Sequence, residues 1–362
     1  MAILPVARCP ACEVPEPFSQ GQMWLDNGDI VQRLNPSARV GFMECENLDP
    51  VFHNLGDIIG MNIEPLVVKI AARAVEYYMN NLIPREIKEK IIRKEMNPEP
   101  LALPINTYCH VIGYGKYEYL RSRYERDEED YVVYRVTRPF SAPLVAGALA
   151  GALSATVGGE HEVTYREVEP GVFEFTTSWT EYPEVVREKF TLRQYRHRRG
   201  DLELERCPSC GTPAAFRDYR WELEEGLIFD RRTGRRMALL GPEILDHLFE
   251  ALEEELGPDI PRAVVEAQRR FTRTGYYSAG EVQNRREFRL QLALRGMGNL
   301  REIEMGEKGL LMRLENAAGY LLLVGTMQGL YELAYGTESQ VEWLVSRDGF
   351  LEVKVTPRLQ GV

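Results

Sequence analysis

The sequence predicts an α+β protein that contains the same unit twice, and three observations lead to this prediction. Two short steps of the form CxxC lie far apart, at Cys9–Cys12 and Cys207–Cys210. Similar residues follow both steps in the same order, which is the mark of an internal repeat. In each copy, segments with helical periodicity precede segments with apolar residues at every second position. This order is typical of helices followed by an antiparallel sheet.

The repeat is clearest where the two copies align without gaps. Residues 48–73 align with residues 245–270, and Trp24 aligns with Trp221 at the same offset. Nine positions of the ungapped segment are identical in the two copies: Leu48, Asp49, Phe52, Leu55, Gly60, Ile63, Val67, Val68 and Arg73. We therefore expect an internal duplication, with a first domain over residues 1–200 and a second over residues 201–362, joined by a charged connection.

Composition and charge restrict the class of protein. The chain has 362 residues, 44% of them hydrophobic, which is enough to bury a core without disulfides. Its net charge of −11 argues against binding to nucleic acid or to an anionic lipid surface. The most apolar run, residues 142–157, is too short to span a bilayer. We expect a cytoplasmic protein whose reduced cysteines serve metal or redox chemistry.

Each copy begins, after its CxxC knuckle, with a β-hairpin and two helices. Asn27-Gly28 lies between two apolar arms and predicts a tight hairpin turn. A helix over residues 48–59, ended by Gly60, comes next, followed by a second helix over residues 63–82 with its apolar residues on one face. Residues 260–271 form the shorter twin of this second helix.

The first copy carries an extra segment, in which residues 85–95 predict an exposed helix and Pro98, Pro100 and Pro104 predict a loop. Each copy then ends in strands around one helix. In the first copy these elements cover residues 131–136, 141–157, 162–168 and 172–179, and in the second they cover residues 310–316, 317–335, 341–345 and 350–355. Both central helices contain GxxxG, which we expect to let the helix lie close to the sheet.

The pair of strands, the GxxxG helix ended by Gly158 or Gly336, and the last hairpin resemble the 4-vinyl-reductase-like (hydrocarbon-binding) domain. The similarity covers residues 40–179 and 237–356. That family shares its fold with haem-NO-binding sensor domains and with the palmitate-binding small subunits of TRAPP vesicle tethers. Its members sense phenols and other aromatic compounds, and some are attached to proteins of bacteriochlorophyll synthesis. The resemblance implies a pocket for a small apolar molecule.

The chain departs from this family in the last hairpin. Aromatic-sensing members carry a cysteine-rich metal site there, whereas residues 166–175 and 345–353 contain no cysteine. That sensory metal site is therefore not carried over to this chain.

The two CxxC steps are the strongest chemical signal. Each is a knuckle that supplies two thiolates, and a closed structural zinc site requires four ligands. We expect Cys9, Cys12, Cys207 and Cys210 to share one structural zinc ion. An iron–sulfur cluster, or cysteines without metal, would give the same pattern. A thioredoxin-like dithiol is disfavoured because no suitable βαβ unit follows either step.

Other reactive side chains have simpler interpretations. Cys45 and Cys109 lack counterparts in the other copy and are expected to be buried apolar residues. We expect Cys109 and His110 to lie on a strand, with side chains on opposite faces, so that they do not act as nucleophile and base. Arg39 and Arg236, present in both copies, are expected to pair with a helical carboxylate such as Asp49 or Asp246. No phosphate-binding, dinucleotide-binding or hydrolase motif is present in the sequence.

The predicted function is the binding of a small hydrophobic, aromatic or tetrapyrrole-like ligand between helices and sheet. The first copy, longer and more aromatic, is the expected binder, with Tyr77, Tyr78, Tyr108 and Phe140 in the lining. One alternative is an enzyme, or enzyme subunit, acting on an aromatic or polyketide-like substrate. Another is a structural accessory subunit of a larger complex. A homo-oligomer or a partner protein stays open in each case.

Overall fold

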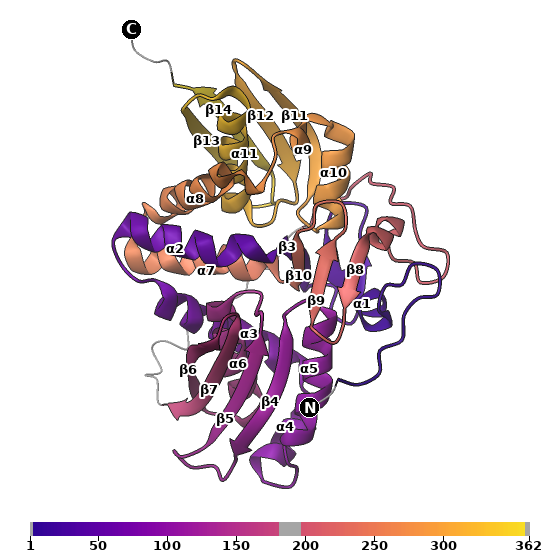
Figure 1. Ribbon diagram of the computed structural model, residues 1–362, viewed down its shortest axis with the longest axis vertical. Helices are drawn as coiled ribbons and strands as arrows, with labels where there is room; N and C mark the ends of the chain where they lie inside the picture. The colour runs from indigo at the N-terminus through magenta and orange to yellow at the C-terminus, as the bar shows by residue number, and fades with distance from the viewer. Residues whose placement is uncertain (1–2, 181–196, 359–362) are drawn as a thin grey trace.

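The computed structural model describes residues 3–180 and 197–358 and confirms the α+β class (Figure 1). Its described strands form three antiparallel sheets. The six-stranded sheet has the order β1-β2-β3-β10-β9-β8, and its strands are β1 Gln22–Trp24, β2 Ile30–Gln32, β3 Arg39–Glu44, β8 Tyr219–Glu222, β9 Leu227–Asp230 and β10 Arg236–Leu240. The two halves of the chain thus contribute three strands each to one sheet.

Each half also builds a four-stranded sheet of its own. The first has the order β4-β5-β7-β6 and consists of β4 Lys116–Arg123, β5 Tyr131–Thr137, β6 Glu160–Glu169 and β7 Val172–Thr180. The second has the order β11-β12-β14-β13 and consists of β11 Asn299–Gly306, β12 Gly309–Glu315, β13 Ser339–Val345 and β14 Leu351–Pro357. In Figure 1 these sheets lie at opposite ends of the molecule, with α2 and α7 between them.

The described helices follow the same order in both halves. The first half contains α1 Glu16–Gly21, α2 Leu48–Ile59, α3 Glu64–Leu82, α4 Arg85–Ile92, α5 Ala102–Val111 and α6 Ala142–Val157. The second half contains α7 Pro242–Leu256, α8 Ile260–Phe271, α9 Gly280–Gln283, α10 Arg285–Leu294 and α11 Tyr320–Tyr335. The predicted helices over 48–59, 63–82, 141–157 and 260–271 are confirmed to within a residue or two. Gly60 ends α2 in the left-handed conformation, as expected of a C-terminal glycine.

One predicted loop is a helix. Residues 102–111, which follow the proline-rich stretch and include Cys109 and His110, form α5 rather than a loop and a strand. Pro104 is the third residue of this helix. A proline in the first turn removes no intrahelical hydrogen bond, because the first N–H groups of a helix have no partner within it.

The two halves meet along β3 and β10, which pair antiparallel from Gly41–Leu240 to Glu44–Met237. Every residue of both strands is buried. One continuous apolar core extends from this seam into both halves and includes Leu55 and Val67 of the first half and Leu248 and Val264 of the second.

Arg39 and Arg236 also stabilise this seam, because each guanidinium donates to carbonyl groups of the opposite half. Arg39 reaches the carbonyl of Gly296 at 2.8 Å, and Arg236 reaches that of Gly113 at 3.2 Å. Arg39 also forms a fully buried ion pair with Asp29 of the hairpin, at 2.8 Å.

The helical carboxylates that we expected as arginine partners each accept a hydrogen bond from the backbone. Asp49 accepts a hydrogen bond from the backbone N–H of Ala142, and Asp246 accepts one from that of Gly319. Both N–H groups lie at the N-terminal end of a central helix, where a carboxylate is favoured by the helix dipole.

The glycines of the GxxxG helices face a helix, not the sheet as expected. A Cβ atom at Gly151 of α6 would lie 2.1 Å from the backbone oxygen of Ala72 in α3, and one at Gly147 would lie 2.5 Å from that of Val68. Gly325 of α11 has the same relation to α8, since its Cβ would lie 2.5 Å from the oxygen of Val265. The missing side chains let two helix backbones come into close contact.

We expect Gly151→Ala to lower the free energy of unfolding by about 2 kcal/mol or more, because the added methyl group forces α3 and α6 apart. Gly280→Ala is the matched control, since its Cβ would meet only the Ser278 hydroxyl at 3.5 Å in a helix. The control should be neutral or slightly stabilising. Urea unfolding of both variants measures the difference, and equal stabilities would contradict this account of the helix contact.

Candidate metal centre and ligand cavity

The two CxxC steps form matching knuckles. In the first, the N–H of Glu13 donates to the carbonyl of Cys9 at 2.8 Å; in the second, that of Gly211 donates to the carbonyl of Cys207 at 2.9 Å. Both donors have the left-handed conformation, with φ of 62° at Glu13 and 75° at Gly211. This turn closes each loop so that both cysteine side chains point to the same side.

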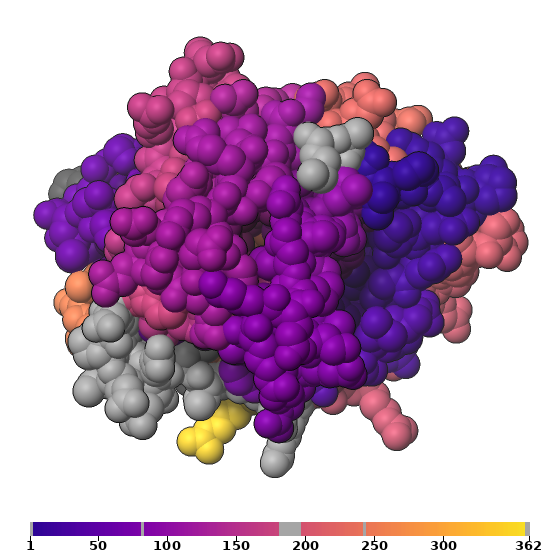
Figure 2. Space-filling view, turned by 90° about the horizontal axis from the view of Figure 1, so that it is seen from below, coloured from indigo at the N-terminus to yellow at the C-terminus, as the bar shows by residue number. Residues whose placement is uncertain are grey.

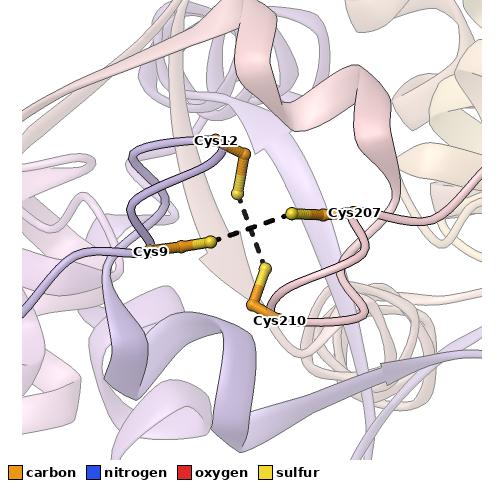
Figure 3. Close-up of side chains that lie close together, drawn as sticks. All are labelled: Cys9, Cys12, Cys207 and Cys210. Atoms are coloured by element: carbon orange, nitrogen blue, oxygen red, sulfur yellow. Dashed lines mark hydrogen bonds between the residues drawn. The ribbon is translucent and has the colours of Figure 1, made fainter.

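The structure brings the four predicted cysteines together (Figure 3). All four sulfur atoms lie within 4.8 Å of one another, so that this cluster could hold a metal ion. The Sγ atoms of Cys9 and Cys207 are 3.7 Å apart, and those of Cys12 and Cys210 are 3.5 Å apart. A tetrahedron with zinc–sulfur bonds of about 2.3 Å has edges of about 3.8 Å. The cluster therefore has nearly the size of a tetrahedral thiolate site.

The surroundings of the cluster favour the ionised thiolate at Cys207 and disfavour it at Cys12. The backbone N–H groups of Cys210 and Ser209 lower the pKa of Cys207 to about 6, so that this sulfur is ionised at neutral pH. Burial raises the pKa of Cys12. A bound cation would remove that penalty, because it stabilises the ionised form of every ligand around it.

A small aromatic core supports the knuckles. Phe18 and Phe216, which occupy corresponding places in the two halves, have ring centroids 5.5 Å apart. Trp24 and Trp221 pack around the same two rings. Aromatic packing of this kind buries a large apolar area, and it fixes the two knuckles relative to each other.

Hydrogen bonds cross between the halves around this core in pairs. The indole of Trp24 donates to the carbonyl of Leu294, and that of Trp221 donates to the carbonyl of Val111, both at 3.1 Å. The guanidinium of Arg8 donates to the carbonyl of Trp221 at 3.0 Å. In the reciprocal contact, Arg206 donates to the carbonyl of Trp24 at 2.8 Å. The cysteine cluster thus lies beside side chains that connect the two halves in both directions.

A cavity of about 450 Å³ lies in the first half, between α3, α5, α6, β4 and β5. Residues of the second half also line it, among them Leu239 and Leu240 of β10 and Ile244 and Leu245 of α7. Figure 2 shows the first-half side of the molecule, where purple and magenta segments surround a narrow opening. The lining is mostly apolar and aromatic.

The predicted residues Tyr77, Tyr78, Tyr108 and Phe140 all line this one cavity. Tyr77 and Tyr108 are 45% and 39% exposed, whereas Phe140 is only 5% exposed. The first two therefore lie towards the outside and Phe140 lies in the interior. Their contact with a ligand stays a prediction.

Several lining residues escaped the sequence analysis: Asn106, Cys109, Tyr114, Tyr117, Tyr119 and Tyr134. The alternation of Tyr117 and Tyr119 was the available signal, since residues two apart on a strand share one face. Asn106 gave no signal, because its helix was taken for a loop.

The side chains of Cys109 and His110 have different surroundings and do not act as a pair. Cys109 lines the cavity, and burial raises the pKa of its thiol to about 12, so that it stays protonated. Nδ1 of His110 lies 2.7 Å from the carbonyl of Leu223 in the second half, and its Nε2 accepts the N–H of Tyr117 at 2.8 Å. Both nitrogens are occupied, so that His110 does not serve as a base for the thiol.

No protein-family model matches the chain, and none of the curated proteins does. Solved structures of H-NOX proteins are among those similar to part of it. One comes from work on haem distortion in the H-NOX family, with 17% identity, a TM-score of 0.24 and coverage of 33% of this chain and 75% of the other.

A second, from work on the mechanism of H-NOX activation, has the same identity and TM-score and covers 33% and 76% of the two chains. A third, a mutant of the T. tengcongensis H-NOX, has 16% identity, a TM-score of 0.23 and coverage of 32% and 73%. Scores this low support no conclusion about haem or another ligand in this chain. None of the described helices is both long and apolar enough to span a bilayer.

His110, which links α5 to the second half, predicts that the stability of the fold depends on pH. Burial lowers the pKa of His110 below its ordinary value of 6.5. The unfolded chain therefore takes up a proton first, and the free energy of unfolding falls as the pH decreases below 6.5. His161, whose pKa burial lowers to about 4, contributes in the same direction.

We expect His110→Phe to lose about 1–3 kcal/mol of stability at pH 7.5, because it leaves the N–H of Tyr117 unpaired and removes one of the two hydrogen bonds at the Leu223 carbonyl, which also accepts the N–H of Gly226. The same variant should show a shallower fall in stability between pH 6.5 and 4, because the contribution of His110 is lost while that of His161 remains. Chemical unfolding at several pH values measures both effects. His53→Gln, at a side chain that is 80% exposed, is the control. Parallel pH curves for His110→Phe and the unaltered protein would contradict the proposed protonation.

Proposed function

We propose that this protein is a zinc-containing binding protein for a small hydrophobic or aromatic ligand, built from two 4-vinyl-reductase-like domains over residues 1–200 and 201–362, in the cytoplasm. The observation that carries the proposal is the aromatic cavity of about 450 Å³. Its volume lies within the range of about 300–1,000 Å³ that is usual for small-molecule sites.

The chemistry of the lining supports binding rather than catalysis. Burial raises the pKa of Tyr117 and that of Tyr134 above the ordinary value for tyrosine. Together with the protonated thiol of Cys109, these groups are neutral at physiological pH. General acid–base catalysis instead requires groups that titrate near the working pH. A neutral, aromatic lining suits a ligand held by burial and ring contacts.

The support for zinc is the set of donors. Four thiolates with tetrahedral spacing are the usual ligands of a closed structural zinc site, while an iron–sulfur cluster with the same ligands is the alternative. When bound, zinc would link Cys9 and Cys12 to Cys207 and Cys210 and so fasten the two halves. It would have no part in ligand chemistry, since none of the four cysteines lines the cavity.

We expect freshly purified protein to contain about one equivalent of zinc, because two knuckles make one closed site. Cys207→Ser should lose that equivalent, since three thiolates bind less tightly than four. Cys45→Ser, which alters a buried cysteine outside the cluster, is the control and should keep it. Elemental analysis measures both. Iron with sulfide, or full zinc content in Cys207→Ser, would contradict the shared zinc site.

We expect the uncharged fluorescent probe N-phenyl-1-naphthylamine to bind in the cavity. Ala152→Trp should weaken this binding at least tenfold, because the indole takes up space on the α6 side of the lining. Leu333→Trp, at a helix position that is 40% exposed, is the control. Fluorescence titration measures affinity, and native mass spectrometry detects a co-purified ligand, with a visible absorption band marking a tetrapyrrole. Equal affinities in all three proteins would argue against this cavity as the binding site.

A further inference from the structure

Three tyrosines of the cavity lining have hydroxyl groups without a partner. Tyr114 precedes β4, Tyr117 lies in β4 and Tyr134 lies in β5. None of the three hydroxyls forms a hydrogen bond with any residue that the structure describes. The enclosed polar atoms that lack a partner include the amide of Asn106, but none of these hydroxyl oxygens. Each hydroxyl oxygen therefore keeps surface that a small molecule can reach, whereas the amide of Asn106 does not.

The accessible surface of these hydroxyls belongs to the cavity. Tyr117 is only 3% exposed, and Tyr114 and Tyr134 are half-buried. Burial raises the pKa of all three phenols above the ordinary value for tyrosine, as expected for groups far from the outer solvent. Because all three side chains line the cavity, the surface that their hydroxyls keep faces its interior.

The three hydroxyls form one group, which we call the tyrosine cluster. The rings of Tyr117 and Tyr134 meet edge to face, with centroids 6.3 Å apart. After burial, the neighbouring phenols of Tyr114 and Tyr134 raise the pKa of Tyr117 further, which requires them to be close to it. Tyr119 lines the same cavity but differs from the cluster, because its hydroxyl lies 2.7 Å from that of Ser122 and is already paired.

Unpaired phenol hydroxyls favour a ligand that accepts hydrogen bonds. A phenol can donate one hydrogen bond and accept others, and it is the better donor because its ring draws electron density from the oxygen. A hydrocarbon in the cavity would displace water from the hydroxyls without replacing the hydrogen bonds of that water, which weakens binding. A carbonyl oxygen has two lone pairs, so that it can accept from two hydroxyls of the cluster at once.

The charges of the lining argue against a charged ligand. Its charged residues are Arg39 and Glu99. Arg39 is held in its ion pair with Asp29 and in a hydrogen bond to the second half, and Glu99 is exposed. A charged group in the interior of the cavity would thus lack a counter-ion, and burying an unpaired charge is costly.

We propose that the cavity selects an uncharged aromatic ligand that carries at least one carbonyl group, and that the tyrosine cluster recognises the carbonyl oxygen. The inference rests on the proposed binding function and names the class of ligand for the same cavity. Apolar side chains of the lining, such as Leu149 and Leu153 of α6, contact the ring system, while the hydroxyls set the orientation of the ligand.

Three two-ring compounds with the same carbon skeleton test this inference: tetralin, 1-tetralone and tetralin-1-carboxylate. Each is titrated against bound N-phenyl-1-naphthylamine, with displacement followed by fluorescence. The unaltered protein should bind 1-tetralone about tenfold or more tightly than tetralin, because the carbonyl oxygen gains hydrogen bonds. It should bind the carboxylate most weakly of the three, because the negative charge has no partner in the cavity.

Tyrosine-to-phenylalanine variants locate the preference, because each removes one oxygen atom and keeps the ring. The triple variant Tyr114→Phe, Tyr117→Phe, Tyr134→Phe should bind tetralin at least as tightly as the unaltered protein does and should lose the preference for 1-tetralone. If the triple variant does not fold, the single variants Tyr117→Phe and Tyr134→Phe provide the test, and each should lower the preference. Tyr119→Phe is the matched control and should keep it, since that hydroxyl is already paired with Ser122.

The outcomes separate this inference from the proposed function. If tetralin or the carboxylate binds as tightly as 1-tetralone, or if the phenylalanine variants of the cluster keep the preference, the tyrosine cluster does not select a carbonyl ligand, while the cavity still binds apolar molecules. If neither the fluorescent probe nor any of the three compounds binds, the proposed function fails, and the inference fails with it.

Discussion

The pairing of β3 with β10 determines how everything else is arranged. Both strands are buried over their whole length, and they join the two halves into one sheet. Backbone hydrogen bonds in such a seam must be made within the protein, because water does not reach them. The contacts around the seam occur in pairs, with each half donating from its arginine and its tryptophan to carbonyls of the other.

This arrangement brings the two CxxC steps together, so that their four cysteines form one cluster. Each knuckle alone supplies two sulfurs, which is half of a closed site. The aromatic core that Phe18 and Phe216 form lies beside the knuckles, and the four sulfur atoms lie within 4.8 Å of one another. A metal bound there would strengthen an association that the sheet and the aromatic core already specify.

The cavity depends on the same seam. Its lining comes from α3, α5 and α6 of the first half and from β10 and α7 of the second half. His110 strengthens the connection, because its ring links α5 to the Leu223 carbonyl. The binding site that we propose therefore belongs to the whole molecule, although most of its aromatic residues come from one half.

By itself, the sequence determined the α+β class, the order of the main elements and the four cysteines, because periodicity, hairpin turns and metal knuckles are local patterns. It also pointed to the tyrosines at positions 77, 78 and 108, since aromatic residues gathered in one copy. Local patterns could not show that Pro104 stands in the first turn of α5, nor that Gly151 faces a helix, because both depend on what lies beside them in space. Only the tertiary structure decided that Asn106 is buried without a partner at the edge of a cavity. Hydrogen-bond satisfaction is a property of the neighbours a side chain acquires on folding, and those neighbours come from distant parts of the chain.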